Sequence, residues 1–534
     1  MTDLVDAVLA ACDAHAAESG LSSAPRRGTR IETLTYAELG QRIRSTAQGL
    51  RDLGMRHGDR VLFSVRPGPD AVILALGIVH AGGAVVFADP GAGEALLRAR
   101  TALAAPTWVA AESLLYLAST PLLRPLARRR GLDLPAYADI VPDARHLYAG
   151  RWLPGVPRGA HSLRGFDTPL RGTQPAEPRA FDTPLRGTQP AAGDEALIVF
   201  TSGTTAAPRA VVHTRGSLGA GLADVAAASM REGQRVVTDQ LMVGIPALIA
   251  GAHWIMPAAG FDPGAAPENY LQLLDGADVL FLPPAALDVI LRILEDEPSL
   301  VPTGLETLIL GGAPVLRPLL ERAFARFPGV TIRAVYGMTE IVPVAIADGA
   351  EKLARSEAEG DYVGRLVPSV RARLDGADEN GGELIVAGPG LASGYLGEAP
   401  LTEVRTGDRA RLDGDELTLL GRTKDMFIRG TQNVYPGLYE PVIAGIPGVD
   451  EAVMTGVPDA IGDDRIVVLV VPRMPPVHPD PRHPIAVSVA RILPELLDAG
   501  VLPDLVVAVP SLPTSGRSKK LDRAAVAALA KGLL

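Results

Sequence analysis

The sequence is poor in cysteine and in aromatic residues, and it has no excess of basic side chains. Its single cysteine, Cys12, excludes an intramolecular disulfide and a zinc site built from several thiolates, and it fits a reducing compartment. Aromatic residues make up only 4% of the 534 residues, which leaves few stacking surfaces for single-stranded nucleic acid. The formal net charge is −10, so the overall field of the protein opposes nucleic-acid binding. We therefore expect no nucleic-acid partner.

Long apolar runs are also absent. No stretch reaches the roughly 18 uninterrupted apolar residues that a bilayer-spanning helix requires. The N-terminal segment carries Asp3, Asp6 and Asp13 and no lysine or arginine, whereas a secretory signal peptide begins with basic residues. Hydrophobic residues make up 47% of the chain and charged residues 21%, as in ordinary globular proteins. We expect a cytoplasmic protein without a transmembrane segment, and the sequence leaves its oligomeric state open.

Strand-like and helical patterns alternate along two stretches of the chain, residues 1–110 and 278–345. Strands that alternate with helices are typical of parallel sheets covered by helices. The expected strands are 60–65, 84–88, 279–282, 307–310 and 331–335, and the expected helices are 70–80, 284–295 and 315–327.

The remaining segments have different patterns. Residues 361–420 contain short strand-like runs separated by glycine, which predicts a small β-subdomain. After residue 423 the pattern is mixed, with strand-like runs at 466–471 and 505–509 and an alanine-rich helix after Asp522. About a hundred residues are enough for a separate small domain.

A Pro-, Gly- and Arg-rich segment contains a tandem duplication. Residues 164–175 recur almost unchanged as residues 179–190. Two copies are too few for a solenoid, and the composition favours a flexible surface linker or insert over residues 160–192. A docking peptide for a partner protein is the alternative.

The strongest local motif is an apolar strand-like run, 197–200, that leads directly into Thr201-Ser202-Gly203-Thr204-Thr205. Gly203 permits a positive φ, and successive backbone N–H groups and hydroxyls in such a turn converge on an anion. The motif therefore indicates phosphate binding, with an ordinary Ser/Thr turn as the alternative. It is not the P-loop of nucleotide triphosphatases, because the Gly-Lys-Ser/Thr ending is missing.

Three further segments carry polar side chains that suit a nucleotide. Tyr336-Gly337-Met338-Thr339-Glu340 directly follows a strand-like run, where α/β proteins bind ligands, although Glu340 alone fits a solvated carboxylate. Asp408 in Thr406-Gly407-Asp408 suits the capture of ribose hydroxyls. The segment 513–523 presents lysines in a glycine-containing loop before a helix, which in isolation fits a solvated basic turn.

Together and in this order, these segments resemble the adenylate-forming superfamily, which includes acyl-CoA synthetases, the adenylation domains of peptide synthetases and luciferases. The resemblance extends from Thr35 to Arg523. The sequence pieces that carry it are TSGTT, YGMTE, TGD, GRTKDMFIRGTQNVYP and KKLDR. It implies ATP and Mg²⁺ as cofactors and a small-molecule carboxylic acid as substrate.

The resemblance also assigns roles to residues. It implies that Lys520 bridges the acyl carboxylate and the adenylate, that Thr339 contacts the α-phosphate, and that Lys424 is the hinge about which the C-terminal domain rotates. Lys520 and Mg²⁺ would then neutralise the charge that develops when a carboxylate attacks phosphorus. The residues that it places around ATP, Mg²⁺ and CoA are the phosphate loop Thr201, Ser202, Gly203, Thr204 and Thr205 with Arg209, the adenine contacts Tyr336 and Gly337, the ribose contacts Asp408 and Arg422, the metal ligands Glu340 and Thr201, and Gly430 on the CoA tunnel.

Several residues depart from the family pattern. The phosphate loop continues as 206–210, Ala-Ala-Pro-Arg-Ala, so both usual glycines are missing and Arg209 replaces the usual lysine. Lys519 replaces the glycine before Lys520 and competes for its role, although alignment on Leu521-Asp522-Arg523 favours Lys520. The Phe-His pair that gates the acyl pocket is expected near 241–249, where the chain has no histidine, so we expect an atypical acyl site.

Two activities follow from this resemblance. The first, which the loop around Gly430 favours, is an AMP- and pyrophosphate-forming acid–CoA ligase. The second is an adenylating enzyme whose acceptor is an intramolecular hydroxyl, an amine or a carrier-protein thiol. The segments 87–93, 241–256 and 340–345 resemble fatty-acid ligase-like enzymes related to olefin β-lactone synthetases, which close a ring without CoA.

The expected fold class is a multidomain α/β fold of α+β type. Residues 1–422 are expected to form a large N-terminal adenylation domain of two helix-flanked sheets with the small β-subdomain. Residues 423–534 are expected to form a small, mobile α+β C-terminal domain.

Overall fold

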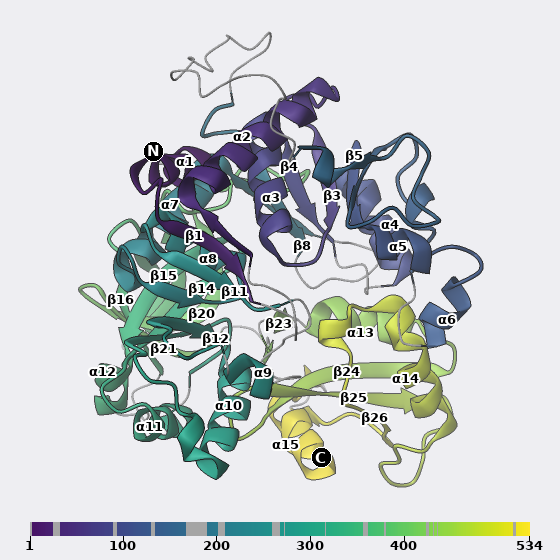
Figure 1. Ribbon diagram of the computed structural model, residues 1–534. Helices are drawn as coiled ribbons and strands as arrows, with labels where there is room; N and C mark the ends of the chain where they lie inside the picture. Colours follow the sequence, from purple (N-terminus) through teal and green to yellow (C-terminus); the bar gives the residue numbers. More distant parts are fainter. Residues whose placement is uncertain are drawn as a thin grey trace, which may run out of the picture.

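The computed structural model describes residues 3–24, 32–88, 93–129, 134–166, 190–200, 209–258, 267–271, 273–315, 317–355, 361–378, 381–422, 427–430, 432–434, 436–515 and 520–534. Their main elements are two large sheets separated by helices and a third, smaller sheet near the C-terminus (Figure 1). This is the multidomain α/β architecture expected from the sequence. No helix of the described ranges is both long enough and apolar enough to cross a bilayer.

The first large sheet has eight strands, and its central strands are parallel. At one edge of the sheet β9 runs antiparallel to both of its neighbours, β8 and β19. The order is β19 (Gly394–Tyr395), β9 (Ala210–Thr214), β8 (Glu195–Phe200), β4 (Ala84–Phe87), β3 (Arg60–Ser64), β5 (Trp108–Glu112), β6 (Arg145–Ala149) and β7 (His161–Ser162).

The second large sheet has thirteen strands; those from β14 to β1 in the order below are parallel, and the pairings at both edges are antiparallel. The order is β17 (Arg371–Asp378), β18 (Gly381–Ala387), β20 (Val404–Asp413), β21 (Glu416–Arg422), β16 (Asp361–Leu366), β15 (Ile341–Asp348), β14 (Thr331–Met338), β13 (Thr307–Gly311), β12 (Val279–Leu282), β10 (Arg235–Val237), β11 (His253–Met256), β1 (Ser19–Ser23) and β2 (Glu32–Thr35).

The main hydrophobic core fills the space between these two sheets. Five helices supply it: α1 (Leu4–Ala14), α2 (Tyr36–Asp52), α3 (Pro69–Ala81), α7 (Arg215–Ser229) and α8 (Leu241–Ile249). A second core lies under α10 (Pro284–Asp296) and α11 (Arg317–Arg326) on the other face of the thirteen-stranded sheet. The strands between Asp361 and Arg422 share a further core with β15, which lies next to β16 in the same sheet.

Residues 427–534, which we call the C-terminal unit, pack around a three-stranded sheet of β24 (Val449–Pro458), β25 (Asp464–Pro472) and β26 (Leu505–Ala508). One face of this sheet is covered by α13 (Pro436–Ala444) and α14 (Pro484–Leu496), and the other by α15 (Arg523–Leu533). Two short hairpins complete the unit: β22 (Phe427–Arg429) with β23 (Gln432–Val434), and β27 (Thr514–Ser515) with β28 (Lys520–Leu521). The exact domain boundary at 422/423 stays a prediction.

The segment expected to be a flexible linker, 160–192, begins with packed residues. β7 pairs with β6, and the following turn η3 (Leu163–Phe166) contacts the main core. A Cβ added to Gly49 of α2 would lie 2.4 Å from the Phe166 ring, so this ring packs directly on the helix backbone. Residues 161–166 therefore pack on the domain through a partly buried aromatic ring, and the linker over 160–192 stays a prediction. Residues 167–189, which hold most of the duplication, lie outside the described residues.

A buried ion pair ties the start of the chain to α7. Arg215 donates to both carboxylate oxygens of Asp3 at 2.7 Å, and the two side chains are only 4% and 8% exposed. Asp3 also caps α1, because it accepts from the backbone N–H groups of Val5 and Asp6. Burial by itself raises the pKa of Asp3, but the hydrogen bonds and charge of Arg215, with the backbone N–H groups, outweigh it and lower the pKa.

We predict that Asp3→Asn lowers the free energy of unfolding at pH 7 by about 3 kcal/mol, because it leaves the buried Arg215 charge without its main partner. Asparagine keeps the helix cap, so the loss reports the charge. A carboxylate with a lowered native pKa stabilises the fold above its unfolded pKa of about 3.9, and this contribution disappears as the pH falls through the native value.

Urea unfolding of both proteins at pH 7 and near pH 3 measures this effect, and the gap between them should shrink in acid. Asp13→Asn is the matched control on α1. Its carboxylate is 66% exposed and pairs with Arg44, so its loss should cost less than about 1 kcal/mol. An equal loss in the two variants would contradict the prediction.

Candidate active site

The Tyr336–Glu340 motif forms a tight hairpin between β14 and β15. Sequence reasoning placed all five residues after the strand, but Tyr336, Gly337 and Met338 are the last residues of β14. The strand is longer than expected because β15 returns antiparallel and pairs Ile341 with Met338. Thr339 and Glu340 are therefore the two turn residues.

The structure brings together Tyr336 and Asp408, the two residues that the resemblance assigns to adenine and ribose. The Tyr336 hydroxyl donates to Asp408 Oδ2 at 2.6 Å. Asp408 is 6% exposed and lies on β20, where its backbone N–H donates to Thr406 Oγ1 at 3.0 Å. Thr406 in turn donates to the Leu384 carbonyl at 3.0 Å, which fixes this part of β20 against β18. Across the sheet, the backbone of Asp408 is paired with that of Arg422 on β21.

Glu340 is held by a residue that sequence reasoning missed. The Tyr395 hydroxyl donates to Glu340 Oε1 at 2.7 Å, and Glu340 is only 7% exposed. Arg209 stacks over the Tyr395 ring at 3.8 Å and makes two hydrogen bonds to Glu398, at 3.0 and 2.9 Å. The hydrogen bonds to Glu398 raise the pKa of Arg209. No local sequence pattern marks Tyr395, because the pairing of β19 with β9 brings it to the site.

His213 is a second residue that sequence reasoning missed. It lies on β9 and is 4% exposed, and burial lowers its pKa, which favours the neutral ring. Its Nε2 lies 2.7 Å from the Thr339 carbonyl oxygen, and its Nδ1 lies 3.2 Å from Ser217 Oγ. A carbonyl oxygen only accepts, so Nε2 carries the proton and donates to it. His213 thus holds the backbone of the Thr339–Glu340 turn.

A cavity of about 1710 Å³ begins at these residues and extends between the helices of the main core. Tyr336, Thr339, Glu340 and Asp408 border its polar part. The segment 241–249, where the acyl pocket was expected, is the helix α8, and it borders the cavity. The apolar lining includes Leu76, Val79, Leu218, Leu222, Leu241, Val243, Ile245 and Phe281.

The other predicted site residues are only partly described. The phosphate loop Thr201, Ser202, Gly203, Thr204 and Thr205, the hinge Lys424, and Lys519 lie outside the described residues. Only the backbones of Arg422 on β21 and Lys520 on β28 are described. Gly430 forms the turn between β22 and β23 with a φ of +59°, a conformation that favours glycine.

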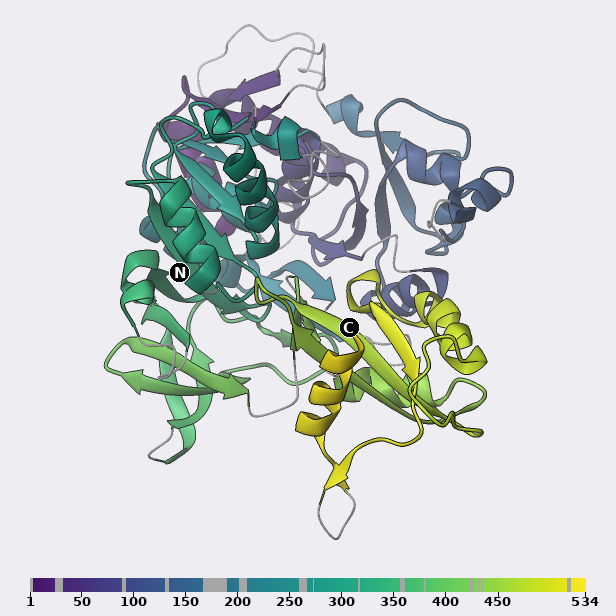
Figure 2. The ribbon, with the colours of Figure 1, turned by 90° about the horizontal axis from the view of Figure 1, so that it is seen from below.

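The two hairpins of the C-terminal unit lie on different sides of it. Ile428 of the β22–β23 hairpin, together with Pro436, borders the cavity. The β27 end lies at the outer edge of the molecule and points away from the large sheets (Figure 2). Arg523 at the start of α15 makes hydrogen bonds of 2.6 and 2.8 Å to Glu440, which joins α15 to α13. In this orientation the β22–β23 hairpin borders the cavity through Ile428, while Arg523 at the start of α15 also lines it.

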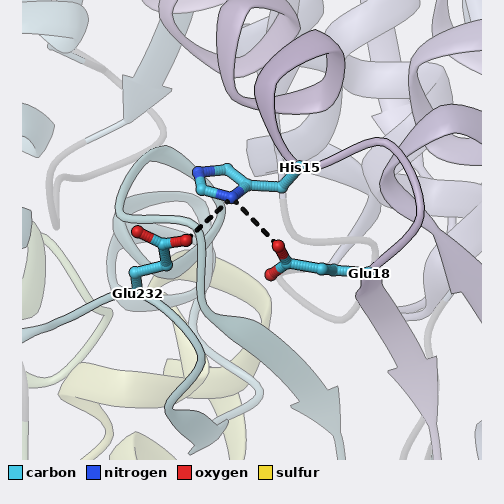
Figure 3. A group of neighbouring side chains, drawn as sticks. All are labelled: His15, Glu18 and Glu232. Carbon is cyan, nitrogen blue, oxygen red and sulfur yellow. Dashed lines mark hydrogen bonds and ion pairs between the residues drawn. The ribbon is translucent and has the colours of Figure 1, made fainter.

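A group of side chains with metal-ligand spacing lies elsewhere. His15 Nδ1 is 3.4 Å from a carboxylate oxygen of both Glu18 and Glu232 (Figure 3). The two glutamates are 48% and 66% exposed, and none of the three residues borders the cavity. The group is a surface contact that joins the end of α1 to the loop before β10.

Comparison with known proteins agrees with this geometry. The family model for AMP-binding enzymes matches residues 12–396. A feruloyl-CoA synthase from Amycolatopsis sp is 29% identical, over 82% of this chain and 86% of that protein. A long-chain-fatty-acid–CoA ligase from Thermus thermophilus is 28% identical, over 92% of this chain and 90% of that protein. The solved structure of the amide bond synthetase McbA from Marinactinospora thermotolerans superimposes with a TM-score of 0.74 at 23% identity, covering 99% of both chains.

The match covers the hairpin that carries Tyr336 and Glu340, the strand that carries His213, and the helices α2, α3, α7 and α8 around the cavity. The chain is therefore a member of the AMP-binding enzyme family, the adenylate-forming superfamily.

Proposed function

We propose that the protein is an ATP-dependent ligase that activates an apolar carboxylic acid as its acyl-adenylate and then transfers the acyl group to CoA. The observation that carries the proposal is the continuity of one cavity, which joins the Tyr336–Asp408 pair and Glu340 to a long apolar space between the helices. Adenine and ribose would lie at the polar part, and the acid would extend into the apolar part. The relatives named as CoA ligases support a thioester product.

The residues present fit ATP and Mg²⁺. Glu340 and Thr339 offer hard oxygen donors, which Mg²⁺ prefers, and Asp408 offers a carboxylate to a ribose diol. When bound, Mg²⁺ would neutralise phosphate charge. The Tyr395 hydroxyl and the His213 ring hold Glu340 and the Thr339 backbone in place, so little reorganisation would be needed when the nucleotide binds.

In the first half-reaction, a carboxylate oxygen of the acid attacks the α-phosphorus, and the bond to the pyrophosphate oxygen breaks. Lys520 would neutralise the charge shared by the carboxylate and the α-phosphate. In the second, the CoA sulfur attacks the acyl carbon, loses its proton, and AMP leaves. The C-terminal unit must present Lys520 in the first step, and the cavity-facing Gly430 hairpin suits the second.

The proposal is tested by measuring pyrophosphate exchange and AMP release over a panel of aliphatic and aromatic acids, with and without CoA. We expect exchange with apolar acids and one CoA consumed for each AMP released. AMP release that does not depend on CoA would overturn the CoA step and indicate an amine, an internal hydroxyl or a carrier thiol as acceptor. The absence of exchange with every acid would overturn the adenylation step.

A further inference from the structure

The C-terminal unit contacts the eight-stranded sheet region through two helices. α14 packs against α4 (Glu94–Ala104), and Figure 1 shows the unit beside α4. A Cβ added to Gly93, the residue that caps α4, would lie 3.5 Å from the carbonyl oxygen of Pro494. The backbones of the two regions are therefore in close contact at this point.

A buried ion pair lies within this contact. Arg100 of α4 pairs with Asp498, which follows α14, and their side chains are 5% and 9% exposed. The guanidinium of Arg100 also lies 5.3 Å from the centre of the Phe200 ring. Phe200 is the last residue of β8, directly before the predicted phosphate loop. The pair thus joins the C-terminal unit to the part of the sheet that precedes this loop.

The ion pair contributes more to the orientation of the C-terminal unit than to the free energy of unfolding. In the orientation described here, both charges have left water, and the cost of that transfer offsets most of their mutual attraction. Among the described atoms, Arg100 Nε is buried without a hydrogen-bond partner, which adds a further cost. If the C-terminal unit rotates away, both charges are rehydrated. If one partner is removed, the other charge stays buried in the closed contact without an opposite charge. Removing one partner therefore costs more than removing both.

We propose that Arg100 and Asp498 are positioning residues for the second half-reaction: the pair holds the C-terminal unit in the orientation that places the Gly430 hairpin at the cavity. The inference rests on the proposed function, since it assigns this orientation to acyl transfer. Neutralising one partner should disfavour this orientation and leave the adenylation orientation, in which the contact is broken, available. Neutralising both partners should restore the acyl-transfer orientation, because two apolar side chains pack in a buried contact without an uncompensated charge.

The test uses the full chain with Arg100→Met, Asp498→Leu and the double variant. We expect each single variant to slow the single-turnover transfer from preformed acyl-adenylate to CoA by about 10-fold or more, within the usual range of conformational coupling. Pyrophosphate exchange should change by less than about twofold. The double variant should recover most of the transfer rate, which a double-mutant cycle measures as coupling between the residues. Arg98→Met is the matched control, because Arg98 is on the same helix, is 48% exposed and pairs with Glu94 one turn earlier.

Amide hydrogen exchange of α4 and α14 gives a readout that does not depend on activity. Both helices should exchange faster in the single variants and return toward wild type in the double variant. Normal transfer in both single variants, or a double variant as slow as the singles, would overturn the inference, as would unchanged exchange of α4 and α14. If the wild-type protein shows no pyrophosphate exchange or no use of CoA, the proposed function fails instead, and the amide exchange result alone decides whether the pair controls the contact.

Discussion

Replacing Lys520 with alanine should lower the rate of acyl-adenylate formation by a factor on the order of 10² or more, as expected when a partner of transition-state charge is removed. The binding of ATP should change little, because Tyr336 and Asp408 lie on the large sheet and not on the C-terminal unit. The variant should still use a preformed acyl-adenylate, because the Gly430 hairpin faces the cavity when the β27–β28 hairpin points away.

Pyrophosphate exchange measures the first effect, and transfer from a synthetic acyl-adenylate measures the second. Lys519→Ala is the matched control, since it removes the same charge one residue earlier and should keep exchange near the wild-type rate. The assignment is wrong if Lys519→Ala is the inactive variant and Lys520→Ala keeps full exchange. In that case the alignment on Leu521-Asp522-Arg523 is misplaced by one residue.

Replacing Glu340 with glutamine should lower adenylate formation at a fixed Mg²⁺ concentration by about 100-fold, because the amide keeps the shape of the side chain and loses the charge that attracts the cation. The amide oxygen of glutamine still accepts a hydrogen bond, so the contact with the Tyr395 hydroxyl is retained. The lower rate of adenylate formation in Glu340→Gln therefore reports the missing negative charge and not a displaced Thr339–Glu340 turn.

Exchange rates over a series of Mg²⁺ concentrations check this prediction, and the half-saturating concentration should rise. Tyr395→Phe is the comparison: it removes the hydrogen bond but keeps the carboxylate, so it should cost about 10-fold or less, as for one neutral hydrogen-bond donor. A Glu340→Gln variant with wild-type Mg²⁺ dependence would exclude Glu340 as the metal ligand.

Sequence reasoning succeeded where the signal is local. The strand at 279–282 and the helix at 284–295 match β12 and α10 closely, because hydrophobic periodicity depends only on neighbours along the chain. The resemblance assigned Tyr336 and Asp408 to one nucleotide, and the structure places their side chains in contact, although the contact itself was not predicted. The end of β14 was misjudged because an antiparallel partner extended the strand beyond its parallel portion.

The residues that sequence reasoning missed depend on contacts between distant segments. Tyr395 reaches Glu340 only because β19 pairs with β9, and His213 reaches Thr339 only because the two sheets approach each other there. Arg100 and Asp498 are 398 positions apart and meet through the packing of two domain-sized units. A single sequence carries no periodic signal for such contacts.

The strand β19 has a consequence for how the site responds to distant changes. It lies in the chain between β18 and β20 of the thirteen-stranded sheet, yet it pairs with the eight-stranded sheet. The hydrogen bond from Tyr395 to Glu340 therefore spans a seam between two sheets, and so does the one from His213 to Thr339. A small sliding of one sheet against the other would lengthen both bonds together. The helices packed between the two sheets fix how the sheets lie relative to each other. They therefore also set where the carboxylate of Glu340 lies.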